Sequence, residues 1–335
     1  MILVTYGTRP EYLKVKPLIT EMEKRGMKFK TLFTGQHKDI APKDATFQFE
    51  MVDYEGNRLN SVLKNCLSIP EEWFDGIDYI LVQGDTTSVV GLAMNALNRK
   101  IKVIHLEAGL RTHDNNNPYP EENNRKIVST LASIHLCPTY DNKFNLLKEK
   151  VGDKNGVEAY IVGNTILDTL VDYKKDCAYE NKILVTMHRR ENHDDMEEWF
   201  STINRLARNN PSYEFILPLH PNPKVQKHKD LLTHVNVIDP ISHNELIQIL
   251  IKCRLVITDS GGIQEECSFF NKKCLVCRKV TERPESVGES SFMVEYPHNL
   301  EGLFTNHIND FTLDIESPYG DGDSSNKICD ILEKL

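Results

Sequence analysis

The sequence lacks the features that mark membrane, secreted and nucleic-acid-binding proteins. No apolar run approaches the roughly 18 residues that a membrane-spanning helix needs. The first five residues read as a short strand, without the basic start, apolar core and cleavage site of a signal peptide, so we expect a cytoplasmic protein. The formal net charge is −9 and no basic stripe is present, so nucleic acid is not an expected partner.

Two signatures of cofactors are also missing. No G-x-G-x-x-G turn is followed by an acidic residue at the ribose distance of a nicotinamide site. The eight cysteines are scattered, and the C-x-x-C of Cys274 and Cys277 has no second ligand pair nearby, which a zinc site normally needs. We therefore expect reduced, packed cysteines, and no metal ion or other cofactor.

What is present is the pattern of an α/β protein. The 335 residues, 40% of them hydrophobic and 27% charged, are enough for two globular domains. Apolar runs bounded by turns alternate with helical patterns, which predicts two doubly wound, Rossmann-like domains with mainly parallel sheets, facing a cleft. A polar stretch at Val171 to Asn181 separates the two halves.

The predicted elements follow this division. The predicted strands are Ile2–Tyr6, Lys28–Thr34, Tyr79–Gln83, Lys102–Glu107, Ser133–Cys137, Ala159–Val162, Lys182–Thr186, Glu214–Leu219, Val235–Ile238, Arg254–Thr258 and Lys273–Arg278. The predicted helices are Tyr12–Lys24, Thr87–Asn98, Glu122–Leu131, Met196–Arg208, Asn244–Ile251 and Ile263–Phe270.

Two segments read as strand, tight turn and helix, one in each half. The first turn begins at Gly7, and the second contains Ser260, Gly261 and Gly262. Small residues let the backbone approach an anion, and the free N–H groups at a helix start favour negative charge. Each turn is therefore predicted to be ready for a phosphate, although glycine turns of purely structural origin are common.

Carboxylates gather at predicted strand ends of the first half. Asp85 follows one strand, where it could cap a helix, and Glu107 ends the next strand just before a glycine turn. Glu121 and Glu122 follow a loop and could serve only as first-turn acids of a helix. Because a buried carboxylate is costly unless paired, three such positions together favour acid–base chemistry.

The second half supplies a histidine and cations. His220 ends a strand between prolines, and Arg283 ends another, where its guanidinium could reach a diphosphate. A lone histidine is more often structural, but this one is predicted to lie at the same edge as the glycine turn.

The chain resembles a known family. The resemblance is carried in order by Gly7 to Glu11, Gly84 to Thr87, Glu107 to Arg111, Pro120 to Glu122 with Arg125, Gly163 to Thr165, His188 to Asn192, His220 to Asn222, Thr258 to Glu266, Thr281 to Glu285 and Pro318 to Gly322. These motifs are similar to those of the non-hydrolysing UDP-N-acetylglucosamine 2-epimerases and span nearly the whole chain.

The resemblance implies a fold and a reaction. The fold is the two-domain glycosyltransferase-B type, with a catalytic domain at 1–170, a UDP-binding domain at 171–317 and a crossover segment at 318–335 that packs on the first domain, including a helix at Asn326 to Leu335. The reaction is reversible C2 epimerisation of a UDP-N-acetyl amino sugar. It proceeds by anti elimination of UDP to a 2-acetamidoglucal and re-addition. A homodimer and a role in polysaccharide biosynthesis are also implied.

The resemblance also implies roles for residues. The implied catalytic acids and bases are Asp85, Glu107, Glu121 and His220, without an assignment of the group that takes the C2 proton. The implied substrate-binding residues are Arg9, Lys14, Arg125, Leu246, Ser260, Gly261, Gly262, Glu266 and Arg283. Glu266 matches a ribose carboxylate, and Gln36 with His37 matches a region that binds a second, allosteric UDP-sugar in some members.

Four alternatives to this activity stay open. Leu246 stands where members often present an aromatic residue beside the uracil, and relatives with these motifs also act on 6-deoxy-L-sugars or hydrolyse the intermediate to the free sugar. A glycosyltransferase would need an acceptor site instead of clustered carboxylates. A nucleotide-sugar sensor without turnover would be expected to lose the acid–base residues, all four of which are present.

Overall fold

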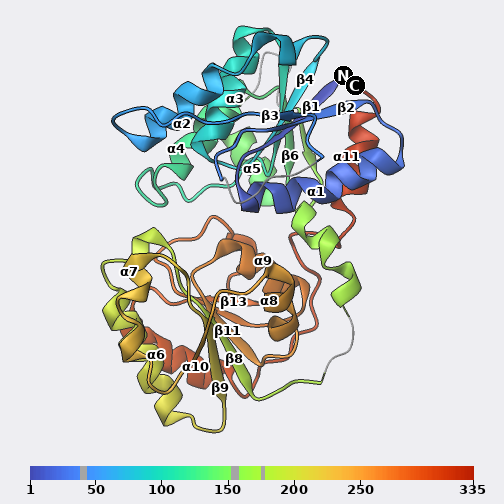
Figure 1. Ribbon diagram of the computed structural model, residues 1–335. Coiled ribbons are helices and arrows are strands. Elements are labelled where there is room, and N and C mark those ends of the chain that lie inside the picture. Colours follow the sequence, from blue (N-terminus) through green and yellow to red (C-terminus); the bar gives the residue numbers. More distant parts are fainter. Residues whose placement is uncertain (38–43, 152–157, 175–177) are drawn as a thin grey trace. The chain divides into compact units, whose positions relative to one another are not determined.

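A computed structural model describes residues 1–37, 44–151, 158–174 and 178–335. The chain forms two compact units: unit 1 comprises Met1–Thr169 with Gly320–Leu335, and unit 2 comprises Leu170–Tyr319. Each unit has its own central sheet flanked by helices (Figure 1). Three residues of the predicted polar break, 175–177, lie outside the described residues.

Unit 1 is built on seven parallel strands in the order β3-β2-β1-β4-β5-β6-β7. The strands are β1 (Ile2–Tyr6), β2 (Phe29–Phe33), β3 (Phe47–Gln48), β4 (Tyr79–Gln83), β5 (Lys102–Leu106), β6 (Ile134–Cys137) and β7 (Ala159–Ile161). The central strands are apolar on both faces, as strands covered by helices on both sides must be. The predicted α/β class with parallel sheets is confirmed.

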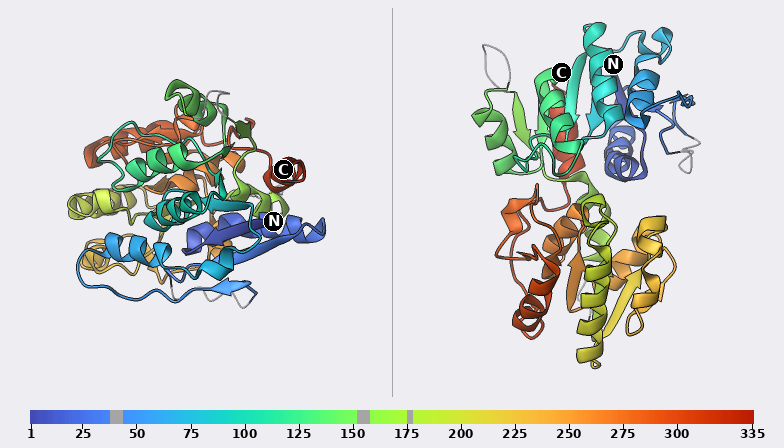
Figure 2. Two further views of the ribbon diagram at one scale, coloured as in Figure 1. Left: turned by 90° about the horizontal axis from the view of Figure 1, so that it is seen from above. Right: turned by 90° about the vertical axis from the view of Figure 1, so that its left-hand side faces the viewer.

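Helices cover both faces of the unit 1 sheet (Figures 1 and 2). They are α1 (Arg9–Lys24), α2 (Arg58–Leu67), α3 (Thr87–Asn98), α4 (Glu121–Leu131), α5 (Tyr140–Lys148) and α11 (Ser324–Leu332). One apolar core joins α1 and α11 to one face, and a second core joins α2, α3 and α4 to the other. The two cores fix the strand ends from which the candidate site is built.

The helix α11 belongs to unit 1 although unit 2 precedes it in the sequence. The Asp168 carboxylate accepts hydrogen bonds from the backbone N–H groups of Ser324 (2.9 Å) and Ser325 (2.7 Å), at the start of α11. Ile328 and Leu332 of α11 are buried in the same core as α1. The crossover back to the first domain is thus present, with a helix that begins two residues before the predicted Asn326.

Unit 2 contains six parallel strands in the order β10-β9-β8-β11-β12-β13. They are β8 (Lys182–Thr186), β9 (Glu214–Pro218), β10 (Asn236–Ile238), β11 (Leu255–Thr258), β12 (Cys274–Val276) and β13 (Ser291–Met293). The helices are α6 (Met196–Asn209), α7 (Pro223–Gln226), α8 (His243–Leu250), α9 (Gly261–Phe269) and α10 (Leu300–His307). A core that contains Trp199 and Phe304 joins α6 and α10 to the sheet, and α8 and α9 lie on the opposite side (Figure 1).

Several elements differ from the prediction. Helix α1 begins at Arg9 rather than Tyr12, because the Thr8 hydroxyl accepts from the Glu11 N–H and caps the helix. Helices α2, α5, α7 and α10 and strands β3 and β13 were not predicted. In the described part of the chain, no helix is long and apolar enough to cross a membrane.

Candidate active site

The predicted phosphate-ready turn at the start of α1 is occupied by a side chain of the protein itself. The Glu11 carboxylate accepts hydrogen bonds from the backbone N–H groups of Gly7 (2.6 Å) and Thr8 (3.1 Å) and from the Thr86 hydroxyl (2.7 Å). Burial raises the pKa of Glu11, and these hydrogen bonds act in the opposite direction. The donors that were expected to meet an anion are therefore already used within the chain.

Glu107 lies directly after β5 and is held by two side chains. Lys14 Nζ lies 2.6 Å from both carboxylate oxygens, and the Gln83 amide donates to Oε2. Glu107 has a φ of 65°, a conformation uncommon outside glycine that persists only where surrounding contacts fix it. Lys14, which the resemblance implied to be near the site, is thus in direct contact with a predicted catalytic carboxylate.

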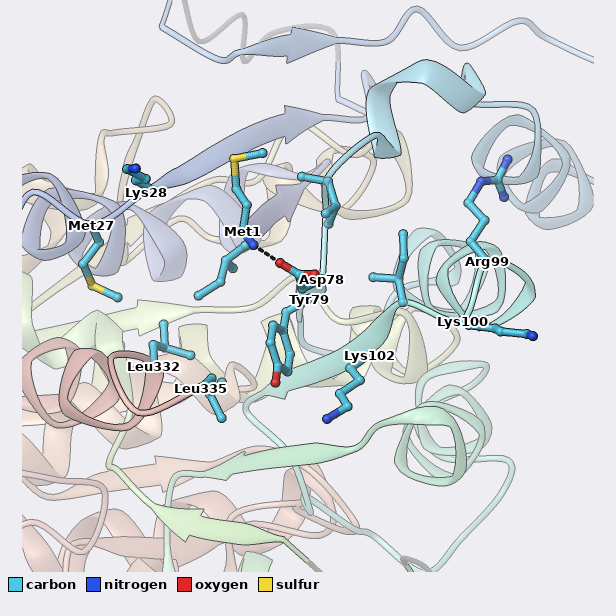
Figure 3. Close-up of a pocket in the computed structure, with 13 residues that line it drawn as sticks. Met1, Met27, Lys28, Asp78, Tyr79, Arg99, Lys100, Lys102, Leu332 and Leu335 are labelled. Atoms are coloured by element: carbon cyan, nitrogen blue, oxygen red, sulfur yellow. Dashed lines mark hydrogen bonds and ion pairs between the residues drawn. The ribbon is translucent and has the colours of Figure 1, made fainter.

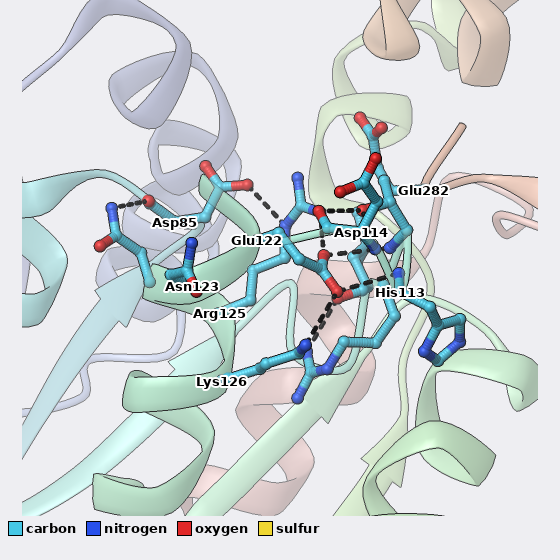
Figure 4. A network of polar contacts seen from close by, with 12 residues as sticks. Asp85, His113, Asp114, Glu122, Asn123, Arg125, Lys126 and Glu282 are labelled. Atoms are coloured by element: carbon cyan, nitrogen blue, oxygen red, sulfur yellow. Dashed lines mark hydrogen bonds and ion pairs between the residues drawn. The ribbon is translucent and has the colours of Figure 1, made fainter. Parts of the chain in front are cut away.

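Asp85 belongs to a second polar cluster in unit 1 (Figure 4). Its carboxylate accepts from Arg125 Nε at 2.8 Å, and Arg125 Nη1 also donates to Glu122 at 3.0 Å. Glu122 is fully buried and accepts from the backbone N–H groups of Thr112 and His113. The capping interpretation of Asp85 is wrong, because Thr86 is the N-cap of α3 and its hydroxyl accepts from Val89 N–H.

Two further predicted residues of unit 1 begin helices. Glu121 is the first residue of α4 and is half-buried. Arg9 is the first residue of α1, is exposed, and donates its backbone N–H to His37 Nδ1 at 3.4 Å. Arg9 is therefore an exposed residue next to the turn that Glu11 fills.

In unit 2, a buried aspartate organises the ends of β8 and β11. The Asp259 carboxylate accepts from the backbone N–H groups of His188 (3.0 Å) and Arg189 (2.9 Å) and from the Asn192 amide (3.1 Å). The ring of His188 stacks on that of His220, with centroids 5.1 Å apart. Burial lowers the pKa of both histidines, and the neighbouring His188 lowers that of His220 further. These shifts favour the neutral form of both rings.

The start of α9 brings Ser260, Gly261 and Arg283 together. Ser260 is the N-cap position, but its side chain makes no capping hydrogen bond. A Cβ on Gly261 would lie 2.9 Å from Cζ of Arg283, so a larger residue there would displace the guanidinium. Arg283 is itself paired with the carboxylates of Glu265 and Glu282. A diphosphate at this turn would meet a guanidinium already held by two carboxylates.

Glu266 and Leu246 lie on neighbouring helices of unit 2. Glu266 Oε1 accepts from His243 Nε2 at 2.7 Å, and within the described chain Oε2 is buried without a hydrogen-bond partner. Burial alone would lower the pKa of His243, but the hydrogen bond and charge of Glu266 outweigh it and raise that pKa. Leu246, half-buried, follows one turn after His243 on α8. The pair leaves one carboxylate oxygen of Glu266 available to a hydroxyl donor.

A pocket of about 660 Å³ lies elsewhere, at the amino ends of the unit 1 strands (Figure 3). Ile2, Tyr79 and Lys102, each at the start of a strand, contribute to its lining, and no predicted site residue does. Among the residues that the structure describes, no group of three His, Cys, Asp or Glu side chains could hold a metal ion. Cys274 and Cys277 are buried free thiols, as expected.

Comparison with known proteins decides the family. A profile of the UDP-N-acetylglucosamine 2-epimerase family matches residues 20–333. The chain belongs to this family. It is 33% identical to the UDP-N-acetylglucosamine 2-epimerase of Neisseria meningitidis, with 99% of each chain covered, and 34% identical to that of Campylobacter jejuni, with 99% of this chain and 97% of the relative covered.

Solved structures of the epimerase family have the same fold. The crystal structure of the N. meningitidis UDP-GlcNAc 2-epimerase bound to UDP-GlcNAc superposes with a TM-score of 0.88, at 32% identity and with both chains fully covered. The Methanocaldococcus jannaschii UDP-GlcNAc 2-epimerase in complex with UDP-GlcNAc and UDP gives a TM-score of 0.84 at 26% identity, with 100% and 99% covered. The glycosyltransferase-B type of fold is thereby confirmed.

Sequence reasoning missed several polar residues around the predicted epimerase site. Three buried residues were missed. Glu11 accepts from the Gly7 N–H, the Gln83 amide donates to Glu107, and Asp259 accepts from the Arg189 N–H. A signal for Asp259 was present, since it stands between a buried strand and a glycine turn. No local pattern marks Gln83, whose partner Glu107 is 24 residues away.

Proposed function

We propose that the protein interconverts UDP-N-acetylglucosamine and UDP-N-acetylmannosamine without net hydrolysis. The observation that carries the proposal is the pair of anchored carboxylates in unit 1. Asp85 is fixed by Arg125 and Glu107 by Lys14, each at the end of a neighbouring strand. Inversion at C2 requires proton transfer on both faces of the sugar, and carboxylates held in place by separate cations suit that task.

In the proposed reaction, unit 1 supplies three of the four acid–base groups, and His220 of unit 2 is the fourth. One of Asp85, Glu107, Glu121 and His220 removes the proton from C2 while the C1–O bond to UDP breaks, which leaves a 2-acetamidoglucal. UDP then adds back at C1, and a second group delivers a proton to the opposite face of C2. Burial and ion pairing of Glu107 and Arg125 support preorganisation, which limits the cost of reorganising charges during the reaction.

In the same proposal, unit 2 binds the UDP. The amides at the start of α9, together with Arg283, receive the diphosphate, and Arg9 of unit 1 adds a further cation. Glu266 Oε2, buried and without a hydrogen-bond partner among the described residues, accepts a ribose hydroxyl. Leu246 packs on the uracil. The UDP-GlcNAc bound to the N. meningitidis relative supports this substrate class.

Product analysis tests the proposal directly. The protein is incubated with UDP-GlcNAc and the mixture is followed by NMR. We expect UDP-ManNAc to appear and no free sugar to accumulate. Free ManNAc with UDP would establish a hydrolysing epimerase instead. Absence of any reaction would contradict the proposal, and turnover of a UDP-6-deoxy-N-acetyl-L-sugar by the same preparation would then reassign the substrate.

The assembly and the setting of the enzyme are proposed on the family resemblance. We propose a cytoplasmic homodimer that supplies a precursor for polysaccharide biosynthesis. Light scattering of the purified protein measures the mass in solution, and a mass equal to one chain of 38.5 kDa would contradict the dimer.

A further inference from the structure

The turn that carries Asp85 is bound by three side chains from three different elements. His105 Nε2 of β5 lies 2.8 Å from the Gly84 carbonyl, Asn124 of α4 donates to the Asp85 carbonyl at 2.8 Å, and the Thr86 hydroxyl donates to Glu11 of α1 at 2.7 Å. Three consecutive residues between β4 and α3 are thus each tied to a separate part of unit 1.

We propose that His105, Asn124 and Glu11 form a clamp that positions Asp85 for proton transfer, with His105 as its main positioning residue. The inference rests on the proposed function, in which Asp85 is an acid–base group. None of the three clamp residues is proposed to touch the substrate. Each acts on the backbone or on the hydroxyl of the turn, so the clamp sets where the Asp85 carboxylate lies.

His105 suits this role because its protonation and tautomer are fixed. A carbonyl oxygen can only accept, so the Nε2 that faces Gly84 carries the proton. The side chain is completely buried, and burial lowers its pKa to about 4, so the ring is neutral at neutral pH. Within the described residues Nδ1 has no partner. Among the described residues, the Gly84 carbonyl is therefore the hydrogen-bond partner of this buried ring.

The turn is also tied to the backbone of β5. Gly84 has a φ of 81°, and its N–H donates to the Leu106 carbonyl at 3.0 Å. A Cβ on Gly84 would lie 3.7 Å from Glu107 Oε2. His105 and Glu107 are two residues apart, on the segment that binds Gly84 from both its N–H and its carbonyl. The clamp therefore fixes Asp85 relative to Glu107, and not only relative to the core.

A purely structural histidine would give a different pattern of effects. Loss of a buried hydrogen bond lowers the stability of the fold whether or not Asp85 is intact. Loss of a positioning contact lowers turnover only while the positioned group is at work. This difference separates the two interpretations by experiment.

The first test compares two substitutions. His105→Phe keeps a ring of similar size but removes the donor, whereas His105→Gln keeps an N–H donor at similar reach. We expect His105→Phe to lower kcat by about tenfold or more with KM within about twofold, since small misplacements of reacting groups are costly. His105→Gln should restore most of the lost kcat.

The second test is a double-mutant cycle. In an Asp85→Asn background, His105→Phe should cause no further loss of kcat, because the group that it positions is already disabled. Asn124→Leu removes the donor to the Asp85 carbonyl from a buried position of α4; it should give the same non-additive pattern and serves if His105→Phe fails to fold. Additive losses for both pairs would overturn the clamp.

The third test does not depend on activity. Amide hydrogen exchange of the segment 84–87 should be faster in His105→Phe than in the unsubstituted protein, while segments of unit 2 stay unchanged. Unchanged exchange at 84–87 would overturn the clamp even if activity falls. A protein that does not convert UDP-GlcNAc would contradict the proposed function, and the exchange measurement would still decide whether the turn is clamped.

Discussion

The starts of α1 and α9 look alike in sequence and differ in the structure. At α1, Glu11 binds the N–H groups of Gly7 and Thr8, so a carboxylate of the chain occupies the place where an anion was expected. At α9, Ser260 makes no side-chain capping bond. A glycine turn before a helix therefore indicates an anion site only where the helix does not supply its own anion from its first turn.

The charged groups near these two helix starts differ in the same sense. In unit 1 the carboxylates of Asp85 and Glu107 are held by cations, and in unit 2 the cation Arg283 is held by carboxylates. In the proposal, three of the four acid–base groups lie in unit 1, and most of the UDP-binding groups lie in unit 2. Substitutions in each unit test whether acid–base chemistry and UDP binding can be changed separately.

The largest effects are expected for acid–base residues of unit 1. Asp85→Asn, Glu107→Gln and Glu121→Gln should each lower turnover by about 100-fold or more, because proton transfer by a placed side chain contributes roughly 10²–10⁴-fold. UDP affinity, measured by calorimetry, should change little. An amide variant with near-normal turnover would remove its residue from the acid–base set, and a large loss of UDP affinity would show that the tasks are shared.

A smaller effect is expected at the α9 turn of unit 2. A Cβ added to Gly262 would meet only Ser260 Oγ, at 3.8 Å, so Gly262→Ala should fold normally. If the diphosphate approaches this backbone, the methyl group should weaken UDP binding about tenfold, or about 1.4 kcal/mol. The matched control is Gly302→Ala in α10, where nothing lies within 4 Å of the added Cβ. Equal UDP affinity in both variants would place the diphosphate elsewhere.

The interior histidines of unit 1 predict a dependence of its stability on pH. Burial lowers the pKa of His105 to about 4 and of His135 to about 3, from an ordinary value of 6.5. The unfolded chain therefore takes up these protons first, and the free energy of unfolding should fall as pH drops from 6.5 toward 4. The expected slope is about 1.4 kcal/mol per pH unit for each histidine.

The two tryptophans allow unit 1 to be observed by itself. Trp73 lies in unit 1 and Trp199 in unit 2, so a Trp199→Phe variant reports the urea unfolding of unit 1 by fluorescence. In this background His135→Phe should reduce the slope of the free energy of unfolding against pH, between pH 6.5 and 4, by the contribution of about one proton. A slope that stays the same would mean that His135 does not titrate as a buried neutral ring.

The smallest expected effect is that of removing divalent ions. The sequence contains no His, Cys and Asp set at metal-ligand spacing, and cations of the chain itself are proposed to receive the diphosphate. Dialysis against a chelator should leave turnover unchanged, without added metal or nicotinamide. Lost activity that one divalent ion restores would contradict the proposal that cations of the chain alone receive the diphosphate.

The sheets were predictable because their strands are short, continuous apolar runs. Tyr79–Gln83 was predicted with the bounds that the structure gives, and the strand predicted at Lys102–Glu107 ends one residue earlier. Helix α5 was missed because it buries only Asn142 and Leu146, and two positions in nine residues leave almost no helical period to detect. An element could be predicted from the sequence only where enough of its residues are buried to leave a hydrophobic pattern.

The candidate site was predictable as a set of residues but not as a set of contacts. Polar residues at the ends of parallel strands meet at one edge of a sheet, so Asp85 and Glu107 could be grouped from sequence. Their partners could not, because Lys14 is 93 residues from Glu107 and Arg125 is 40 residues from Asp85. Glu11, by contrast, carried a local signal, because Thr8-x-x-Glu11 is the pattern of a capping box, in which the glutamate turns back on its own helix start.

The return of the chain to unit 1 has a consequence for synthesis on the ribosome. Unit 2 is one uninterrupted stretch, Leu170–Tyr319, whereas unit 1 needs Gly320–Leu335 to be whole. Until that last stretch emerges, the apolar side chains of α1 that pack against Ile328 and Leu332 have no cover. The second unit to be translated is therefore the first that can finish its core, which reverses the usual order in which domains fold during translation.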